Sequence, residues 1–193
     1  MVSLKQSRPI SFCNVSYKVI PEVLAQRLKV VMETLVIRTQ CSFVSHRHSS
    51  DNIIVTKEVI HSMRHKKENK GWMAIKIDLE KAYDRLSWEF VREILQDIGF
   101  PESFVSLVQV YISTTTMRMI WNRDCLEEFK PSGGIRQGDP LSPYLFVLCK
   151  GQLSHIIDMA VEHRLWKPIH LSREGLALSH LASHKWFGFV LRS

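Results

Sequence analysis

A carboxylate stands at the end of a short alternating run, in the sequence MAIKIDLEKAYD that begins at Met73. Alternation places Ile75 and Ile77 on one side of a strand and Lys76 and Asp78 on the other. An acid at the end of a strand can hold a share of a metal ion. One acid seldom completes a catalytic site, so we expect partner acids elsewhere in the chain.

A glycine-rich stretch, GGIRQGDPLSP at residues 133–143, is the second feature that could do chemistry. Its glycines allow tight turns or close approach to a ligand. Arg136 and Gln137 add a cation and an amide, and a loop of this kind leading into a helix can bind phosphate or a nucleotide. It is not a Walker A loop, because no Gly-Lys-Ser/Thr follows. A tight loop without a ligand is the alternative interpretation.

The elements around these residues follow from periodicity and from capping signals. We expect helices over residues 18–35, from Ser49 or Ser50 through Met63 and ending before Gly71, over 87–98, over 102–113 and onward from Asp139 or Ser142. We also expect a strand over 72–79 and a hairpin of 115–121 with 125–129. This order is α+β rather than a regular βαβ alternation, because it runs from helices through one strand, further helices and a hairpin to a last helix.

Composition limits the classes of function. The chain has 193 residues and is 45% hydrophobic, which fits one globular domain or part of a larger one. Its net charge of +7 favours a polyanionic partner such as nucleic acid. Cys13, Cys41, Cys125 and Cys149 have no zinc-binding or redox spacing, which favours free thiols. No apolar run is long enough to predict a membrane span.

Taken together, IKIDLEKAYD and GGIRQGDPLSP resemble the palm of reverse transcriptases. The likeness is closest to the non-LTR, LINE-type retrotransposon enzymes, particularly the plant-like ones. Residues 8–29 and 40–58 resemble the first two conserved blocks of the family, the second of them in the fingers. The resemblance runs from about Arg8 to Leu181. It implies a polymerase right hand of fingers and palm, RNA-templated DNA synthesis, and an RNA template, a DNA primer and dNTPs as partners inside the cell, in nucleus or cytoplasm.

The resemblance also implies roles for individual residues. Asp78 matches the catalytic acid that binds both Mg²⁺ ions, and the backbone carbonyl of Leu79 would assist it. Tyr83 matches the aromatic gate under the incoming sugar, although a core aromatic packed on its helix is the alternative. We expect Lys81 and Asp84 to hold the turn after the strand.

The remaining matches concern nucleotide binding. Gln137 and Gly138 match residues that contact the incoming nucleotide and the template, and Arg136 could reach phosphate. Arg47 matches a fingers arginine that contacts the triphosphate. The family usually has a glycine before that arginine, whereas this chain has His46, which adopts a left-handed backbone only at a cost.

The second set of metal-binding acids is absent from its expected place. In the family, these acids follow a stretch like LALSHL (176–181) in an aromatic-Ala-Asp-Asp run, but here ASHKWFGFVLRS follows and no acid occurs after Glu174. We therefore expect fingers-like helices over 1–71, a partial palm over 72–181 and a divergent tail outside the palm over 182–193, with the acid-bearing palm hairpin and the thumb absent. Such a chain should not catalyse synthesis. The alternatives are a nucleic-acid-binding module and an unfolded pseudogene remnant.

Overall fold

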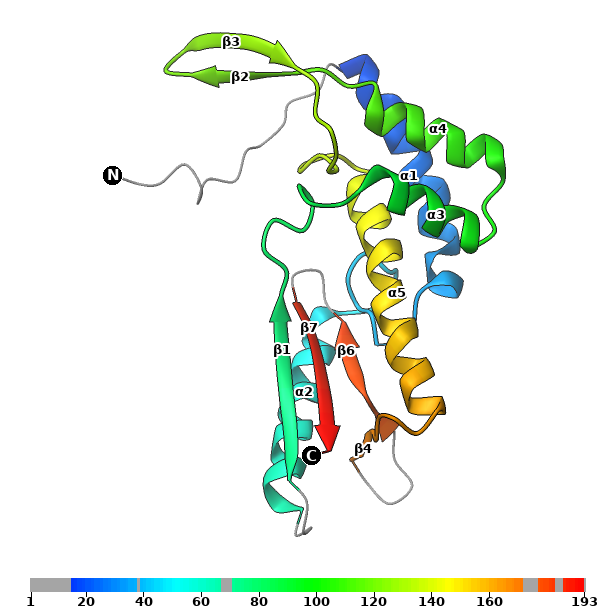
Figure 1. The fold of residues 1–193 in the computed structure, drawn as a ribbon, viewed down its shortest axis with the longest axis vertical. Helices are drawn as coiled ribbons and strands as arrows, with labels where there is room; N and C mark the ends of the chain where they lie inside the picture. The colour runs from blue at the N-terminus through cyan, green and yellow to red at the C-terminus, as the bar shows by residue number, and fades with distance from the viewer. Residues whose placement is uncertain (1–14, 38, 67–70, 172–176, 183–185, 193) are drawn as a thin grey trace. The chain divides into compact units, whose positions relative to one another are not determined.

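The computed structural model describes residues 15–37, 39–66, 71–171, 177–182 and 186–192 (Figure 1). The elements are α1 (Val15–Leu35), α2 (Ser49–His65), β1 (Trp72–Asp78), α3 (Trp88–Asp97), α4 (Glu102–Ser113), β2 (Met117–Trp121), β3 (Asp124–Phe129), α5 (Ser142–Glu162), β4 (Ile169–His170), β5 (Ala177–Leu178), β6 (His180–Ala182) and β7 (Trp186–Arg192). This mixture of helices and strands confirms the α+β prediction, and the helices and hairpin expected from the sequence are present with small shifts of their ends.

The described residues form two compact units. Unit 1 contains those up to Gln26 and from Lys81 to Cys149, and unit 2 contains those from Arg27 to Glu80 and from Lys150 onward. The division into fingers (1–71), palm (72–181) and tail (182–193) stays a prediction.

Unit 2 is built on an antiparallel sheet with the strand order β1-β7-β6. Strand β7 pairs with β1 along its whole length, from Trp72 opposite Arg192 to Asp78 opposite Trp186. Residues Trp186–Arg192, in the segment that we expected to diverge from the palm, thus form the central strand of this sheet, and β7 also pairs antiparallel with β6. The physical reason is local, because the run WFGFVLR is rich in aromatic and branched residues that favour strands.

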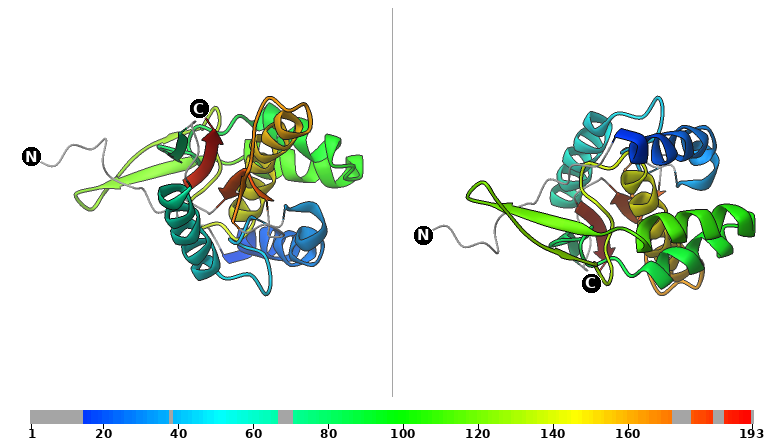
Figure 2. Two further views of the ribbon diagram at one scale, coloured as in Figure 1. Left: turned by 90° about the horizontal axis from the view of Figure 1, so that it is seen from below. Right: turned by 90° about the horizontal axis from the view of Figure 1, so that it is seen from above.

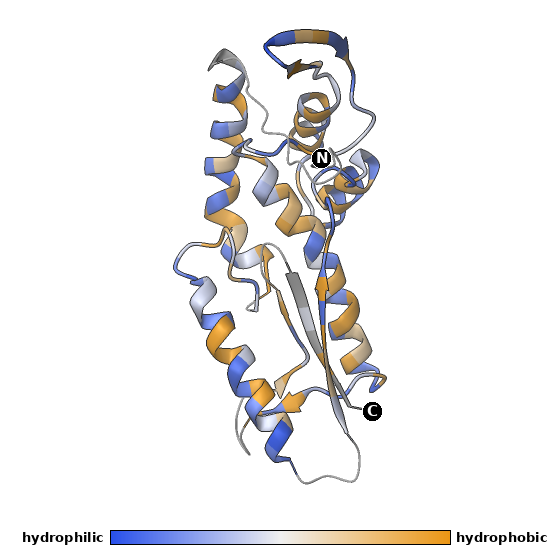
Figure 3. Ribbon diagram, turned by 90° about the vertical axis from the view of Figure 1, so that its left-hand side faces the viewer, coloured by the Kyte–Doolittle hydropathy of each residue, from blue (hydrophilic) through white to orange (hydrophobic). Residues whose placement is uncertain are grey.

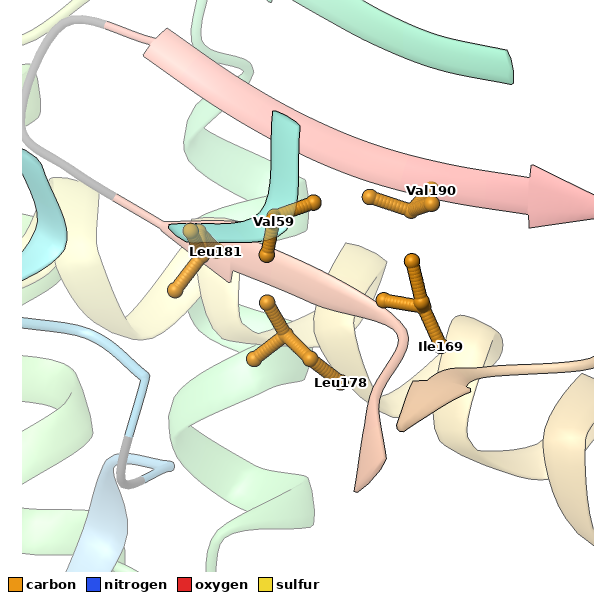
Figure 4. Close-up of a cluster of buried hydrophobic side chains, with 5 residues drawn as sticks. All are labelled: Val59, Ile169, Leu178, Leu181 and Val190. Carbon is orange, nitrogen blue, oxygen red and sulfur yellow. The ribbon is translucent and has the colours of Figure 1, made fainter. Parts of the chain in front are cut away.

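Helix α2 and the second half of α5 lie on opposite sides of this sheet (Figure 3). On the α2 side, the buried residues form one cluster (Figure 4): Val59, Ile169, Leu178, Leu181 and Val190. On the α5 side, Ile157 packs with Ala182. Because successive residues of a strand point to opposite faces, Leu181 and Ala182 face different helices.

The two faces decide where the carboxylate of β1 lies. Ala74 pairs with Val190, which belongs to the α2 side, and Asp78 has the same parity along the strand as Ala74. Asp78 therefore belongs to the α2 face, at the end of β1, where its side chain is exposed.

In unit 1, helices α3 and α4 pack against each other. Helix α3 buries Val91, Ile94 and Leu95, which lie on one face at helical spacing. Gly99 follows the helix with a φ of +91°, a conformation that glycine adopts without strain, and the chain then turns at Pro101 into α4.

Strands β2 and β3 form a ribbon that extends beyond α3 and α4 of the same unit (Figure 2). Asn122 and Arg123 connect the strands and have φ values of 51° and 71°. Two successive residues with positive φ make a turn whose twist matches that of paired strands. All residues of β3 are exposed.

Other predictions concern thiols and membranes. Cys41, Cys125 and Cys149 are free thiols, as expected, whereas Cys13 lies outside the described residues. Within the described part of the chain, no helix combines the length and the apolar character that a bilayer span requires.

Candidate active site

The glycine-rich loop of residues 131–140 is bound to the segment that follows the Asp78 strand. In unit 1, the backbone N–H of Ile135 donates to the carbonyl of Tyr83 (2.9 Å), and that of Gly134 donates to the carbonyl of Leu86 (2.8 Å). The indole N–H of Trp88 donates in turn to the carbonyl of Gly134 (2.6 Å). Two stretches that the sequence separates widely thus form one hydrogen-bonded structure.

Two glycines of this loop, Gly134 and Gly138, differ in what requires a glycine there. Gly134 has a φ of +83°, and a Cβ placed on it would lie 2.9 Å from the carbonyl oxygen of Asp84. Neither the conformation nor the space admits a side chain there. Gly138 also has a positive φ, of 89°, and is exposed, so its backbone is open to a ligand.

Tyr83, the expected sugar gate, is half-buried and its ring stacks on Phe146 of α5 with centroids 4.9 Å apart. Burial raises the pKa of Tyr83 to about 12, so the phenol stays protonated at neutral pH. Stacking fixes the plane of the ring, which a steric gate needs and which a purely structural aromatic also has. The gate role stays a prediction.

Gln137 contacts the same turn as the glycines. Its side-chain Nε2 donates to Oδ1 of Asp84 at 3.4 Å. The turn itself is closed by backbone bonds, since the N–H groups of Asp84 and Arg85 both donate to the carbonyl of Lys81 at 3.0 Å. Asp84 therefore has a contact that joins the turn to the loop.

Arg136 is held inside unit 1. Its guanidinium lies over the rings of Tyr17 and Tyr111, 4.8 Å and 4.9 Å from their centroids. Its Nη2 donates to Oγ1 of Thr115 at 3.2 Å. Cation–π contacts with two rings favour this position. A contact between Arg136 and phosphate stays a prediction. No periodic pattern in the sequence indicates the two tyrosines as its partners.

Asp139 is a functional candidate that sequence reasoning treated only as a possible helix cap. It is 6% exposed, its Oδ1 accepts the N–H of Leu141 at 2.9 Å, and its Oδ2 accepts the hydroxyl of Tyr111. Helix α5 begins afterwards, at Ser142. Asp139 thus connects the loop to Tyr111, whose ring contacts Arg136.

In unit 2, Asp78 ends β1 and the exposed Leu79 follows it. The residue directly opposite Asp78 on β7 is Trp186. Across the described ranges, no three His, Cys, Asp or Glu side chains gather in a way that could hold a metal ion. The residues that the structure describes therefore do not fit a site for two divalent ions.

Arg47 binds the backbone of its own loop. Its Nη1 donates to the carbonyls of Ile37 (2.5 Å) and Gln40 (2.9 Å). His46 has a φ of 62°, the left-handed conformation that the family's glycine would adopt more easily. The loop leads into α2, where the carboxylate of Asp51 accepts the N–H of His48 at 3.3 Å.

Comparison with known protein families identifies the family of this chain. A family model described as "Reverse transcriptase (RNA-dependent DNA polymerase)" matches residues 3–170. The chain belongs to the reverse transcriptase family. Enzymes of this family synthesise DNA on an RNA template and use divalent metal ions.

Curated relatives place the chain among retrotransposon proteins. It is 31% identical over 153 residues to the Pol polyprotein of the type-2 retrotransposable element R2DM of Drosophila melanogaster, covering 76% of this chain and 14% of that protein. It is 26% identical over 145 residues to the transposon TX1 149 kDa protein of Xenopus laevis, covering 75% of this chain and 11% of that protein. These relatives confirm the prediction of a LINE-type reverse transcriptase. The chain spans only a minor part of the relatives' length.

Solved structures agree on the fold. A truncated apo telomerase from Candida tropicalis superposes with a TM-score of 0.58 at 16% identity, over 91% of this chain and 34% of that one. A telomerase from Candida albicans superposes with a TM-score of 0.58 at 14% identity, over 92% of this chain and 30% of that one. The chain thus has part of a right-hand polymerase fold.

The expected site residues of this reverse transcriptase chain divide between the units. Tyr83, Arg136, Gln137 and Gly138 belong to unit 1, where the loop is bound to the turn. Asp78, Leu79 and Arg47 belong to unit 2.

Proposed function

We propose that this chain is a fingers-and-palm part of a LINE-type reverse transcriptase that binds nucleotide and RNA–DNA template–primer but does not itself catalyse DNA synthesis. One observation carries the proposal. The position directly opposite Asp78 is Trp186, so no carboxylate converges with Asp78 from the paired strand. Residues directly opposite each other on antiparallel strands have Cβ atoms about 5 Å apart, which makes this the position where a second acid would meet the first.

The physical argument concerns charge. Two Mg²⁺ ions held about 4 Å apart need converging anionic oxygen ligands in addition to the phosphates of the substrate. Asp78 alone does not supply them. A loss of about 5 kcal/mol of transition-state stabilisation slows a reaction several thousand-fold, which would leave synthesis close to background.

The binding part of the proposal rests on unit 1 and on charge. The loop of residues 131–140 is held against the Tyr83–Trp88 segment, with Gly138 exposed beside Gln137. The whole chain carries a net charge of +7, which favours a nucleic acid as partner. We assign dNTP, RNA template and DNA primer as ligands, and Mg²⁺ as the ion that accompanies the dNTP.

A primer-extension assay on poly(rA)/oligo(dT), with Mg²⁺ and with Mn²⁺, tests the catalytic part. We expect the unaltered chain and Asp78→Ala to give the same background incorporation. The double variant Lys185→Asp/Trp186→Asp restores two adjacent acids, one of them opposite Asp78 in the β-sheet register. It should gain synthesis that Asp78→Ala abolishes. Robust synthesis by the unaltered chain that Asp78→Ala removes would overturn the proposal.

A binding assay with an RNA–DNA hybrid tests the other part. We expect retention of the hybrid that weakens steeply as salt concentration rises, because phosphate contacts release counterions. Near-UV circular dichroism distinguishes a packed chain from an unfolded remnant, since a remnant retains at most far-UV signal. If the chain shows the near-UV signal of a packed protein but does not bind the hybrid, the proposed binding function is wrong.

A further inference from the structure

The side chain of Asn52 joins three segments of unit 2. It is 4% exposed, in the first turn of α2. Its Nδ2 donates to the carbonyl of Thr39 (3.1 Å) and to the carbonyl of Ala182 (2.8 Å), which is 130 residues away in the sequence. We call these two hydrogen bonds the Asn52 junction.

The loop that precedes α2 is bound to the end of β6 by its backbone as well. The N–H of Ala182 donates to the carbonyl of Thr39 at 3.3 Å, and Gln40 forms an isolated parallel bridge with Ala182. Arg47 closes the same loop from the other side, through the carbonyls of Ile37 and Gln40. The loop is therefore a single hydrogen-bonded structure, and the Asn52 junction is the side-chain contact that attaches it to both α2 and β6.

The Asn52 junction lies at the end of β6, and its position determines which strand end it holds. Ala182 is the last residue of β6, and β7 begins at Trp186, opposite Asp78. A group that fixes Ala182 thereby fixes the end of the strand that leads toward the position facing Asp78. Through Thr39, the same group fixes the loop that carries Arg47.

The chemistry of the side chain suits this task. An amide NH₂ has two donor hydrogens, which can serve two carbonyls at once. A carboxylate of the same shape has no donor when ionised, and a hydroxyl has one. The buried carbonyl of Ala182 would lose this donor and keep the cost of desolvation, whereas the partly buried carbonyl of Thr39 would keep the N–H of Ala182 as a donor.

We propose that Asn52 is a positioning residue that sets the Arg47 loop against the β6–β7 end of the sheet, so that a triphosphate bound by the loop meets the strand end that bears Asp78. The inference rests on the proposed function for its nucleotide part. The coupling of loop and strand stands on the hydrogen bonds alone.

The test compares Asn52→Asp, which keeps the shape and removes both donors, with Thr56→Val as the matched control. The Oγ1 of Thr56 donates to the carbonyl of Asn52 (2.6 Å) within the same helix, so its removal leaves the junction intact. Hydrogen exchange is followed in peptides that cover residues 36–48 and 177–182, and the affinity for dTTP is measured on the same samples. Asn52→Ser, which keeps one donor, serves if Asn52→Asp does not fold.

We expect Asn52→Asp to speed exchange in both peptides together by about 10-fold to 100-fold, as the loss of one buried and one partly buried hydrogen bond predicts. Peptides from α3 and α4 should keep their rates, the affinity for dTTP should fall about 10-fold, and Thr56→Val should change neither readout. Unchanged exchange in the two peptides would overturn the junction. Faster exchange with unchanged dTTP affinity would reduce Asn52 to a structural residue and overturn the positioning role. Failure of the unaltered chain to bind dTTP would count against the proposed function and the nucleotide part, while exchange still decides the coupling.

Discussion

The glycine-rich loop of unit 1 and the β6–β7 hairpin of unit 2 differ in what they retain. The loop has its glycines, its backbone contacts to Tyr83 and Leu86, and its polar side chains. The hairpin has its strands and its full register with β1, but Trp186 stands opposite Asp78. The loop thus has the shape and the polar side chains that the family motif predicts, whereas the hairpin has paired strands without an acid opposite Asp78.

This difference shows that shape and chemistry depend on different residues. Antiparallel pairing uses backbone groups and needs only side chains that fit a pleated surface, so the run WFGFVLR pairs with β1 without any acid. Metal binding needs particular oxygen ligands at particular positions, and strand-forming residues cannot replace them. The pairing of β7 with β1 therefore does not depend on the acids that the proposed metal chemistry would need.

The largest effect is expected where the loop meets the turn. Gly134→Ala places a Cβ 2.9 Å from the carbonyl oxygen of Asp84 in a backbone with a φ of +83°. We expect a loss of about 3 kcal/mol in the free energy of unfolding, measured by urea denaturation. Gly151→Ala is the control, because a Cβ there meets no atom within 4 Å and alanine favours helices. Equal stability of the two variants would contradict the close approach at Gly134.

A smaller effect is expected at the buried acid of the loop. Tyr111→Phe removes the hydroxyl that donates to Oδ2 of Asp139, a carboxylate that is 6% exposed. A buried charge that loses a donor costs about 1–3 kcal/mol, which thermal or urea unfolding would detect. Tyr17→Phe is the control, since its hydroxyl donates to the carbonyl of Tyr111 in a partly buried position (2.9 Å). If Tyr17→Phe cost as much as Tyr111→Phe, Asp139 would not depend on its tyrosine.

The elements with local signals could be predicted from the sequence. Helix α4 begins and ends where its apolar period and Pro101 indicate, and the ribbon β2–β3 turns at Asn122 as a residue tolerant of positive φ allows. These features depend on residues close together in the chain. In unit 1, the family motif indicates Tyr83, Arg136, Gln137 and Gly138, but it does not indicate the contacts that hold them. Their roles in nucleotide binding stay predictions.

The long-range contacts could not be predicted. The bonds of Trp88 to Gly134 and of Asn52 to Ala182 end on backbone carbonyls, and backbone carbonyls carry no sequence signal. The pairing of Trp186–Arg192 with β1 was not expected for another reason. The missing acids indicated divergence, whereas the strand propensity of the same residues indicated pairing, and propensity decided the fold.

The comparison can be sharpened at Arg136, which lies between Tyr17 and Tyr111. Arg136→Lys keeps the charge and loses the planar stacking, which should cost about 1 kcal/mol of unfolding free energy. Arg136→Met removes the charge as well. If Arg136 is purely structural, both variants keep the salt dependence of hybrid binding. A salt slope that falls by about one unit in Arg136→Met alone would instead place Arg136 on a phosphate.

The smallest effect is expected in unit 2, at His180, which is 3% exposed. Burial lowers the pKa of His180 below its usual 6.5, and the carboxylate of Asp158, 3.8 Å from Nδ1, offsets part of that shift. A histidine whose folded pKa is lowered favours the neutral form, so its contribution to stability is fully present above its ordinary pKa of 6.5 and is lost as the pH falls from there through the lowered folded pKa. The free energy of unfolding should therefore fall more between pH 7.5 and pH 5 in the unaltered chain than in His180→Gln, which does not titrate. Parallel pH profiles for the two proteins would mean that the α5 face of the sheet accommodates a protonated His180 without loss of stability. That face would then exclude water less completely than the loop of unit 1.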